Sequence, residues 1–477
     1  MDKSASLSAA KESWVAFQTN QGLEIRATPL KLTRHLIVFE VYTPNLVLQM
    51  SEVLAEFKIR VEDRLLYSGR AVVSSVIHTG SGIVCEATLE ESWLDLDWFS
   101  SRDQNQVLQT RFEEFIDASH KAFQVLPDFK IVVADMQNLL MDLRRWLEQV
   151  ELGVRSCPSG DRQQIERETV QALQRPIVPL LHGLFERFEA ACAGVEPHLQ
   201  PAHRTYVKRQ LHPLVLCAPF MYRTFQKPLG YAGDYEMVNM MIRDPCEGGS
   251  VFAKILNIYF LDTAPVIAHR NRIVSLRQML AEETCRAIRS NRPARIFNLG
   301  CGPAQEVQDF LSQSDLSQQA QFTLVDFNTE TLTHLDTVLS EIKRRHQRTA
   351  PVQLIKKSVA QLLKDAAKPA SAYALQDHDF VYCAGLFDYL PDHVCRRLMD
   401  VLYEMLIPGG LLVVTNVHPS NPNRSWMEYS VDWNLFYRDD RQLLSLGPRG
   451  APADACCALA EPSGVNVFLR VRKPEDA

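Results

Sequence analysis

The stretch Asn298-Leu299-Gly300-Cys301-Gly302-Pro303-Ala304 follows the short apolar run Arg295-Ile296-Phe297 and precedes a helical pattern from Gln305 to Leu311. This order predicts a strand that enters a glycine turn at the start of a helix. Two glycines separated by one residue let a ligand approach the backbone, and the first amide groups of the helix supply donors. A dinucleotide fingerprint needs glycine where this chain has Gln305, so a nicotinamide or flavin cofactor is disfavoured. A turn without any ligand is the alternative that this stretch alone leaves open.

Further strands and an acidic residue follow in an order typical of a nucleotide-binding α/β domain. The apolar run 322–325 ends on Asp326, from which a carboxylate can accept both ribose hydroxyls of an adenosine. The other strands are predicted at Asp379–Cys383, before the run Ala384–Leu390, at Leu411–Thr415, after the turn Pro408–Gly410, and at the closing pair Ala453–Leu459 and Val465–Val471. Together these features favour a cofactor site over a turn without a ligand.

This ordered set resembles class I S-adenosylmethionine-dependent methyltransferases over residues 250–477. The resemblance implies a Rossmann-like domain with a seven-stranded sheet that ends in an antiparallel hairpin, and S-adenosyl-L-methionine as the cofactor. Asn298 departs from the family pattern, which usually has an acid there, and Ala304 stands where a third glycine is common. The cofactor-binding residues that the resemblance implies are Tyr231, Gly233, Asp234, Arg272, Asn298, Gly300, Gly302, Asp326, Phe327, Ser358, Val359 and Ala384.

Length and composition indicate a protein of two or three domains, because 477 residues exceed what one core usually serves. Lys and Arg total 51 against 57 for Asp and Glu, a formal charge of −6 without a long basic run, so nucleic acid is disfavoured as a partner. No apolar stretch approaches the ~18 residues that span a bilayer. We therefore expect a cytoplasmic protein without stable membrane insertion. The eleven cysteines contain no C-x-x-C pair, and we expect neither a disulfide framework nor a metal site.

Residues 1–100 are predicted to form a small β-barrel. Apolar or alternating runs lie between turns at Leu36–Tyr42, Phe57–Val61, Gly69–Ile77 and Gly82–Leu89. Their order is similar to the PilZ domain of bacterial cyclic-di-GMP receptors, with Arg26 and Arg34 near the arginine motif and the run 51–54 near the second nucleotide-binding loop. The arginine spacing and the missing Asp and Gly of that loop favour a degenerate docking or regulatory barrel for a protein partner. Nucleotide binding and a purely structural barrel remain open.

Residues 101–245 are predicted to form a helical bundle that caps the third domain, residues 246–477. Apolar residues recur at three- and four-residue steps at Phe112, Phe115, Ile116, Leu139, Leu140, Leu143, Trp146 and Leu147. The run Arg155–Gly160 breaks this period with Pro and Gly and is predicted to join two helices. Apolar stripes of this spacing indicate packing rather than ligand binding.

The linking segment Lys227–Glu236 concentrates glycines, tyrosines and acids, which indicates a binding loop; a loop with solvated charges is the alternative. Here the chain resembles bacterial extracellular-factor or 3-hydroxypalmitic acid methyl ester biosynthesis methyltransferases. The similarity rests on the runs 227–235, 269–272, 298–304, 385–390 and 433–438. It implies transfer of a methyl group to the carboxylate of a 3-hydroxy fatty acid, which gives a methyl ester used as a quorum-sensing signal.

A carboxylic acid with a pKa of about 4 to 5 is ionised at neutral pH, so its methylation needs no general base. The enzyme must align the reacting atoms and exclude water, and a cation or phenol can orient the carboxylate. The catalytic candidates are Tyr231, His418, Tyr437 and Arg438. For a hydroxyl or amine acceptor, His418 or Asp234 would act as the base.

Three function classes therefore stay open. A small-molecule O-methyltransferase predicts an apolar tunnel between the helical cap and the sheet. A methyltransferase for a protein or another macromolecule predicts an open, charged face. A non-catalytic module would bind the cofactor only to recruit partners.

Overall fold

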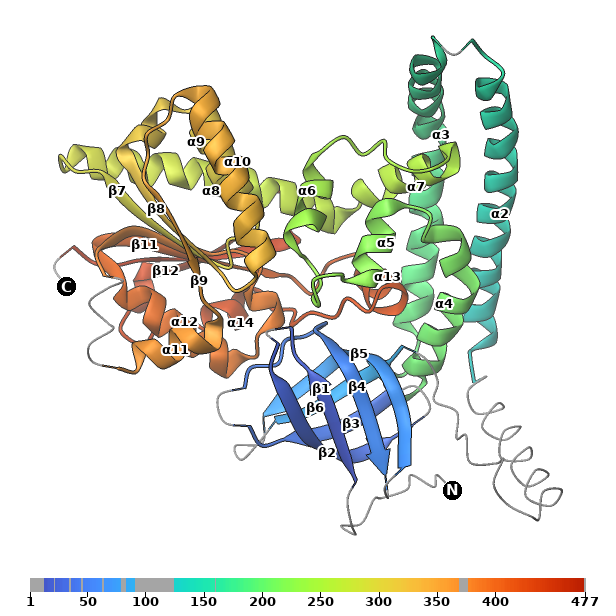
Figure 1. Cartoon of the computed structure of the whole chain (residues 1–477), viewed down its shortest axis with the longest axis horizontal. Coiled ribbons are helices and arrows are strands. Elements are labelled where there is room, and N and C mark those ends of the chain that lie inside the picture. Colours follow the sequence, from blue (N-terminus) through green and yellow to red (C-terminus); the bar gives the residue numbers. More distant parts are fainter. Residues whose placement is uncertain are drawn as a thin grey trace.

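The computed structural model describes residues 13–475 except residues 21, 34–35, 44–45, 62–63, 79–82, 91–123, 159 and 369–375. A β-barrel, a set of long helices and a helix-covered sheet follow one another along the chain (Figure 1). The predicted multidomain α/β architecture is confirmed. The boundaries predicted at residues 100 and 245 stay predictions, and Phe112, Phe115 and Ile116 lie outside the described residues.

The barrel closes in the order β1-β2-β3-β6-β5-β4. Its strands are β1 (Trp14–Gln18), β2 (Glu24–Leu32), β3 (Leu36–Val41), β4 (Val53–Val61), β5 (Arg64–His78) and β6 (Ile83–Leu89). Inward and outward residues alternate along β3 and β6, as a barrel with a packed interior requires. The rings of Phe17, Phe39 and Phe57 meet inside, with centroids 5.4 to 5.7 Å apart. The predicted small barrel is thus confirmed.

The positions compared with PilZ receptors do not form one exposed site. Arg26 is exposed on β2 and stacks over the ring of Trp14, and Arg34 lies outside the described residues. Ser51 and Glu52 are buried where the barrel meets the rest of the chain. The PilZ-like assignment therefore stays a prediction.

Long helices follow the barrel, and α2 and α3 stand side by side in Figure 1. The helices are α2 (Pro127–Arg155), α3 (Arg162–Ala193), α4 (Gln200–Val215), α5 (Pro219–Gln226), α6 (Tyr235–Ile242), α7 (Val251–Leu261) and α8 (Ala264–Arg289). The predicted joint at Arg155–Gly160 falls between α2 and α3. Leu140 and Leu147 are fully buried, whereas Trp146 is 52% exposed, so the predicted stripe was wrong at that residue.

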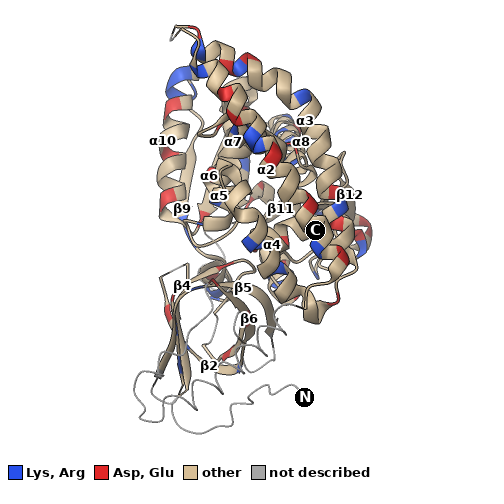
Figure 2. Ribbon diagram, turned by 90° about the vertical axis from the view of Figure 1, so that its right-hand side faces the viewer, with Lys and Arg blue, Asp and Glu red and all other residues tan. Residues whose placement is uncertain are grey.

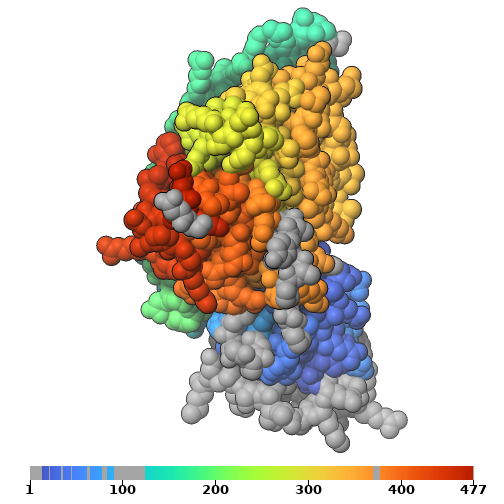
Figure 3. Space-filling model, turned by 90° about the vertical axis from the view of Figure 1, so that its left-hand side faces the viewer, coloured from blue at the N-terminus to red at the C-terminus, as the bar shows by residue number. Residues whose placement is uncertain are grey.

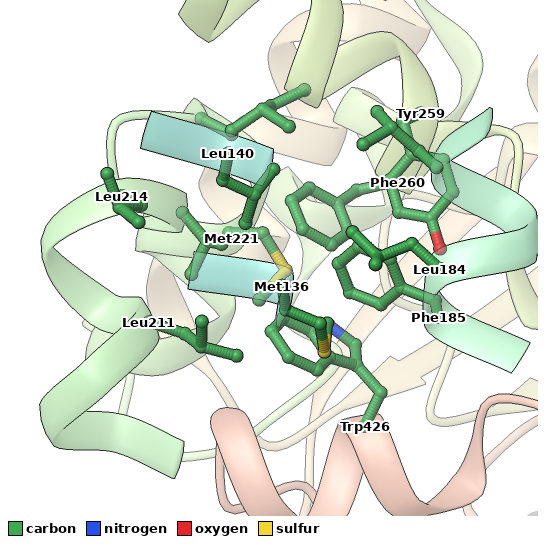
Figure 4. Close-up of a cluster of buried hydrophobic side chains, with 14 of the residues drawn as sticks. Met136, Leu140, Leu184, Phe185, Leu211, Leu214, Met221, Tyr259, Phe260 and Trp426 are labelled. Carbon is green, nitrogen blue, oxygen red and sulfur yellow. The ribbon is translucent and has the colours of Figure 1, made fainter. Parts of the chain in front are cut away.

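The core of the helical part includes a helix from the far end of the chain. Trp426 of α13 (Arg424–Ser430) points toward Phe185 of α3 and Phe260 of α7 (Figure 4). The Trp426 ring stacks on Phe260 at 5.8 Å and meets Phe185 edge-on at 4.6 Å. Such aromatic contacts stabilise a core beyond the burial of their area. The helices are thereby fixed to the C-terminal part of the chain, which positions them over the sheet.

The C-terminal sheet has seven strands in the order β12-β13-β11-β10-β7-β8-β9. They are β7 (Ala294–Leu299), β8 (Ala320–Asp326), β9 (Val352–Lys356), β10 (His378–Cys383), β11 (Leu406–Val417), β12 (Cys456–Ala460) and β13 (Asn466–Arg472). Strands β7 to β11 run parallel to one another, and β13 is antiparallel to both β11 and β12. The predicted sheet with its closing hairpin is confirmed.

Helices cover both faces of this sheet, as parallel sheets require. The helices that follow its strands are α9 (Gln305–Gln313), α10 (Thr329–His346), α11 (Val359–Ala366), α12 (Asp392–Glu404) and α14 (Asp440–Leu444). The run Pro408–Gly410, predicted as a turn, lies inside β11. The pairing of β10 with β11 shifts register there, and Gly409 takes a φ of +77°, so the local irregularity is a bulge rather than a chain reversal.

On α10 the basic residues gather at one end of the helix, and the acidic residues lie further along it (Figure 2). The last turn of α10 carries Lys343, Arg344, Arg345 and His346, where cations complement the helix dipole. Within the described part of the chain, no single helix has the length and apolarity to cross a membrane, although the bent pair α7 and α8 meets both criteria when taken together.

Candidate functional site

A cavity of about 210 Å³ lies at the carboxyl ends of the central strands, where open α/β sheets bind ligands. Its lining includes the turn after β7, the ends of β8 and β10, and the start of α11. Helices α5 to α8 and α13 cover it, and the barrel contributes Gln49. Side chains from all three parts of the chain thus face one enclosed space.

The glycine turn has the backbone shape that a closely approaching ligand needs. Gly300 and Gly302 take φ values of +68° and +52°, and a methyl group added at Gly302 would meet no protein atom within 4 Å. The amides of Gly300 and Cys301 donate to the carbonyl of Val325 over 2.8 and 3.0 Å, which fixes the turn to β8. Ala304, in the place of a third glycine, takes a φ of +47° that is unfavourable for any residue with a side chain. The backbone of the turn is therefore open to the cavity, and the positive φ of Ala304 is the conformational cost of this shape.

Asp326 ends β8 beside this turn. Its Oδ2 accepts the backbone N–H of Gly302 at 3.0 Å, and its Oδ1 accepts that of Asn328 at 2.9 Å. Burial raises the pKa of the carboxyl against the lowering effect of these N–H groups. Each oxygen retains capacity for another hydrogen bond. The carboxylate is thus held in place to accept two neighbouring hydroxyls.

The floor of the cavity holds a second polar group, around Asn298. Its Nδ2 donates to Glu306 Oε1 at 3.3 Å, and the hydroxyl of Tyr382 donates to the same oxygen at 2.7 Å. Asn298 Oδ1 is buried and has no hydrogen-bond partner among the described residues. A buried oxygen without a partner is costly, so it is suited to a donor on a bound ligand.

Arg272, on α8, is a buried cation of the cavity and is only 9% exposed, and Lys357 lines the cavity as well. A methyl group on Gly385 would lie 2.9 Å from its Nη1, so glycine is needed where the guanidinium passes. Burial raises the pKa of the neighbouring Asp388 to about 6. His269 Nδ1 lies 2.9 Å from Arg272 Nη2, and burial together with Arg272 holds the pKa of His269 well below its usual range. His269 is therefore a neutral imidazole at neutral pH.

The linking segment crosses the cavity between the barrel and the sheet. Tyr231 and Gly233 line the cavity, and the Tyr231 ring lies 5.1 Å from that of Phe327. Asp234 does not line it; the carboxylate caps α6, accepting the N–H of Met237 at 2.8 Å and Arg223 Nε at 2.9 Å. The remaining predicted cofactor residues at the lining are Phe327, Ser358, Val359 and Ala384.

Three catalytic candidates lie outside the cavity lining. Arg438 is 3% exposed, and its guanidinium donates to Asp392, Asn416 and the carbonyls of Phe387 and Leu390 over 2.7 to 3.0 Å. His418 pairs with Ser420 through Nδ1 at 2.7 Å. The Tyr437 ring is stacked by the guanidinium of Arg424 at 4.3 Å. The structure therefore gives these side chains structural neighbours and does not bring them to the site, where Tyr231 alone of the four candidates stands.

The cavity contains polar residues that were not among the sequence candidates. The Tyr389 hydroxyl accepts Trp433 Nε1 at 3.0 Å and would lie 2.8 Å from a methyl group on Gly233. Burial raises the pKa of Tyr389, with Asp388 adding to the effect, so the phenol stays a donor. His269 and Gln49 also line the space. Tyr389 lies in the run Ala384–Leu390 that follows β10, which could have indicated it, whereas nothing local marks Gln49.

The covering helices give the cavity an apolar side. Its apolar lining there includes Phe220, Met221, Met237, Met241, Phe260, Val266, Trp426 and Met427, and Val431 and Leu435 add to it just after α13. Methionine side chains adapt to irregular apolar shapes. Across the described residues, no group of three or more His, Cys, Asp or Glu side chains is arranged to hold a metal ion. The cavity thus joins a polar turn at the sheet to a largely apolar helical side, on which α8 also carries His269 and Arg272.

No family model and no curated protein matches this chain. Among solved structures, it is similar to a possible exported protein from Bordetella parapertussis, at 15% identity and a TM-score of 0.38 over 64% of this chain and 97% of that one. It is also similar to the N-methyltransferase NodS from Bradyrhizobium japonicum, in complex with S-adenosyl-L-homocysteine, at 15% identity and a TM-score of 0.30 over 53% of this chain and 100% of that one. An O-methyltransferase family protein from Burkholderia thailandensis gives 12% identity and a TM-score of 0.34 over 58% of this chain and 72% of that one. At these scores the similarities identify neither cofactor nor acceptor, so function must be inferred from the cavity.

Proposed function

We propose that this protein is an S-adenosyl-L-methionine-dependent methyltransferase. The observation that carries the proposal is the convergence of the glycine turn, Asp326, Ser358 and Ala384 on one cavity at the carboxyl ends of four adjacent strands, β9, β8, β7 and β10. Open backbone at Gly302 and a carboxylate with free acceptor capacity suit an adenosine. The departure at Asn298 is compatible with this ligand, because its unpaired oxygen can accept an ammonium donor.

In this proposal Asp326 holds the ribose hydroxyls, Ser358 and Val359 flank the adenine, and Arg272 faces the carboxylate of the amino-acid part. The cofactor supplies an electrophilic methyl group when bound. The protein must then hold the acceptor in line with that methyl group and keep water out, since orientation can supply most of the acceleration. The helical cap and the barrel loop around Gln49 enclose the space in which this occurs.

We further propose that the acceptor is the carboxylate of a 3-hydroxy fatty acid. The apolar wall of Met221, Met241 and Phe260 is the support, because an acyl chain can be buried there beside the polar turn. A carboxylate is already ionised at neutral pH, so no side chain has to remove a proton. The Tyr389 hydroxyl, oriented by Trp433, replaces Tyr437 and Arg438 as the donor that orients it.

A second acceptor class is favoured by His269. A neutral imidazole in the cavity wall can accept a proton from a hydroxyl or an amine, which would make another small molecule the substrate. A macromolecular acceptor has less support, because the cavity lies beneath the helical cap rather than on an open face. A non-catalytic cofactor-binding module differs from both in forming no methylated product.

The proposal is tested by incubating the purified protein with S-adenosyl-L-methionine and a series of 3-hydroxy fatty acids, followed by mass spectrometry. A long-chain product heavier by one methylene supports the fatty-acid acceptor. Met241→Gln should weaken the use of long chains more than short ones, with Val274→Gln as a control at an exposed position of α8. Equal use of all chain lengths would contradict the acyl-chain wall. Within this proposal the barrel is a docking or regulatory module, and a cytoplasmic location stays a prediction.

A further inference from the structure

The barrel contributes Gln49 to the lining of the cofactor cavity, although the barrel and the sheet lie in opposite halves of the sequence. The segment between β3 and β4, called here the barrel loop (residues 46–52), places Gln49 in the same lining as Asp326 and Ser358. Gln49 is only 7% exposed. Among the described residues, its side-chain amide has no hydrogen-bond partner in the protein, and a side-chain amide offers both donors and an acceptor.

The barrel loop is attached to three segments that themselves line the cavity. Met50 N donates to the carbonyl of Tyr389 at 3.3 Å, and Val53 N donates to the carbonyl of Gly230, next to Tyr231, at 2.7 Å. Ser51 forms a reciprocal pair with the Asn434 backbone, its Oγ donating to the carbonyl at 2.9 Å and accepting the N–H at 2.6 Å. Asn434 lies between the lining residues Trp433 and Leu435. The contacts that hold the barrel in place are therefore made with segments that line the cavity.

The shape of the loop is held internally as well. Ser51 is fully buried with a φ of +59°, a conformation that non-glycine residues adopt only where their surroundings hold it. The Glu52 carboxylate, 1% exposed, accepts the N–H groups of Gln49 at 2.9 Å and Asn20 at 3.1 Å. Gln49 is thus placed by a fixed turn rather than by a free loop.

The position of the loop indicates which end of the cavity Gln49 faces. Val53, directly after the loop, bonds Gly230, and the ring of the next residue, Tyr231, lies 5.1 Å from that of Phe327, which follows Asp326. Ser358 and Val359 begin α11 and line the cavity at the edge of the sheet near β9. In Figure 3 the blue barrel abuts the orange surface of the C-terminal part, on the same side of the molecule. The loop therefore borders the nucleoside end of the site through Tyr231, in addition to its contacts with Tyr389 and Asn434.

We propose that the barrel loop is a wall of the adenine pocket and that Gln49 binds the edge of the adenine through its side-chain amide. A side-chain amide can pair with the donor and acceptor that adenine presents side by side, as Asn and Gln do in base recognition. This inference rests on the proposed function, since it takes an adenosine-bearing cofactor as the ligand. It gives the barrel a role that a detached regulatory domain would lack, because cofactor binding and the seating of the barrel then stabilise each other.

The test is calorimetric titration with S-adenosyl-L-homocysteine and with its inosine analogue, in which a carbonyl oxygen replaces the adenine amino group. The wild-type protein should prefer the adenine form at least tenfold, and Gln49→Ala should bind it more weakly and lose most of that preference. Ser51→Ala, whose side chain does not line the cavity, should also weaken binding severalfold because the loop is released. Ser68→Ala, at an exposed position of β5 that pairs with Lys58 rather than with the barrel loop, serves as the matched control and should bind like the wild type.

The outcomes separate the two proposals. Absence of binding by the folded wild-type protein would overturn the proposed function together with this inference. Tight binding with an unchanged adenine preference in Gln49→Ala would overturn the role of Gln49 alone and leave the methyltransferase proposal standing. Thermal unfolding of each variant shows whether it is folded, and Gln49→Ala keeps the test decisive if Ser51→Ala does not fold.

Discussion

Gly302 donates its backbone N–H to Asp326 Oδ2 across 3.0 Å, although the two residues lie 24 positions apart. This bond joins the glycine turn after β7 to the end of the neighbouring strand β8 and sets the carboxylate beside open backbone. The two features of a nucleoside site, a close-approach surface and an acceptor for the ribose, are therefore built as one unit.

Replacing Asp326 with alanine should weaken binding of S-adenosyl-L-homocysteine by roughly 1.5–3 kcal/mol, because the hydrogen bonds to two ribose hydroxyls are lost. Asp326→Asn keeps the volume but has only one acceptor oxygen, so it should fall between the wild type and Asp326→Ala. Calorimetric titration measures both. Wild-type affinity in Asp326→Ala would remove this residue from the site.

A methyl group added at Gly302 should obstruct the ligand without clashing with protein atoms. Gly302 and Gly464 both take positive φ values, +52° and +76°, and an added Cβ meets no protein atom within 4 Å at either position. Both alanine variants should lose about 1–2 kcal/mol of unfolding free energy from the left-handed conformation. Only Gly302→Ala should also lose cofactor affinity, because its methyl group projects into the cavity. Equal affinities in the two variants would show that the turn does not contact the ligand.

We expect Arg438 to stabilise the fold rather than to take part in catalysis. Arg438→Met leaves the buried Asn416 oxygen and the carbonyls of Phe387 and Leu390 without their donor, and each buried acceptor left unsatisfied costs roughly 1–3 kcal/mol. Arg144→Met, which removes an exposed pair with Glu148 on α2, should cost less than about 1 kcal/mol. Denaturant unfolding compares the two. A stable Arg438→Met protein that binds cofactor but transfers no methyl group would instead support a catalytic role.

Glu52 should make the folded protein less stable as the pH rises. Burial raises the pKa of Glu52 to about 7, so the folded state keeps a proton that the unfolded chain releases near its usual pKa. Its contribution is fully present below the unfolded pKa of about 4.5 and is lost through pH 7, an effect on the order of 3 kcal/mol.

The control for this effect is Glu52→Gln, which cannot titrate. The unfolding free energy of the wild type minus that of Glu52→Gln should fall between pH 5 and pH 8. A difference that stays constant over this range would mean that Glu52 is ionised throughout in the folded protein.

The sheet and the glycine turn could be predicted because their signals are local. Apolar runs, paired glycines and an acid at a strand end all lie within a few residues of one another, and Asp326 was found in this way. The barrel was predicted from the runs that form β3 to β6, whereas neither β1 nor β2 was among them, and burial along β1 does not alternate.

The residues that face the acceptor could not be predicted from the sequence, because a residue's position along the chain does not give the direction of its side chain. His418 directly follows β11, and the backbone of Arg438 bonds Val417 at the end of that strand. The Arg438 side chain is nevertheless held by buried acceptors, and the His418 ring is held by Ser420. The contact of Ser51 with Asn434 joins residues 383 positions apart, so no local pattern could place Gln49 in the cavity.

The most direct test of the central claim is calorimetric titration of the wild-type protein with S-adenosyl-L-homocysteine. Saturable binding of one ligand per chain, weakened by Asp326→Ala and Gly302→Ala but not by Gly464→Ala, is the result that a methyltransferase cofactor site predicts. A folded protein that takes up no ligand, or one whose binding is indifferent to Asp326 and Gly302, would contradict it.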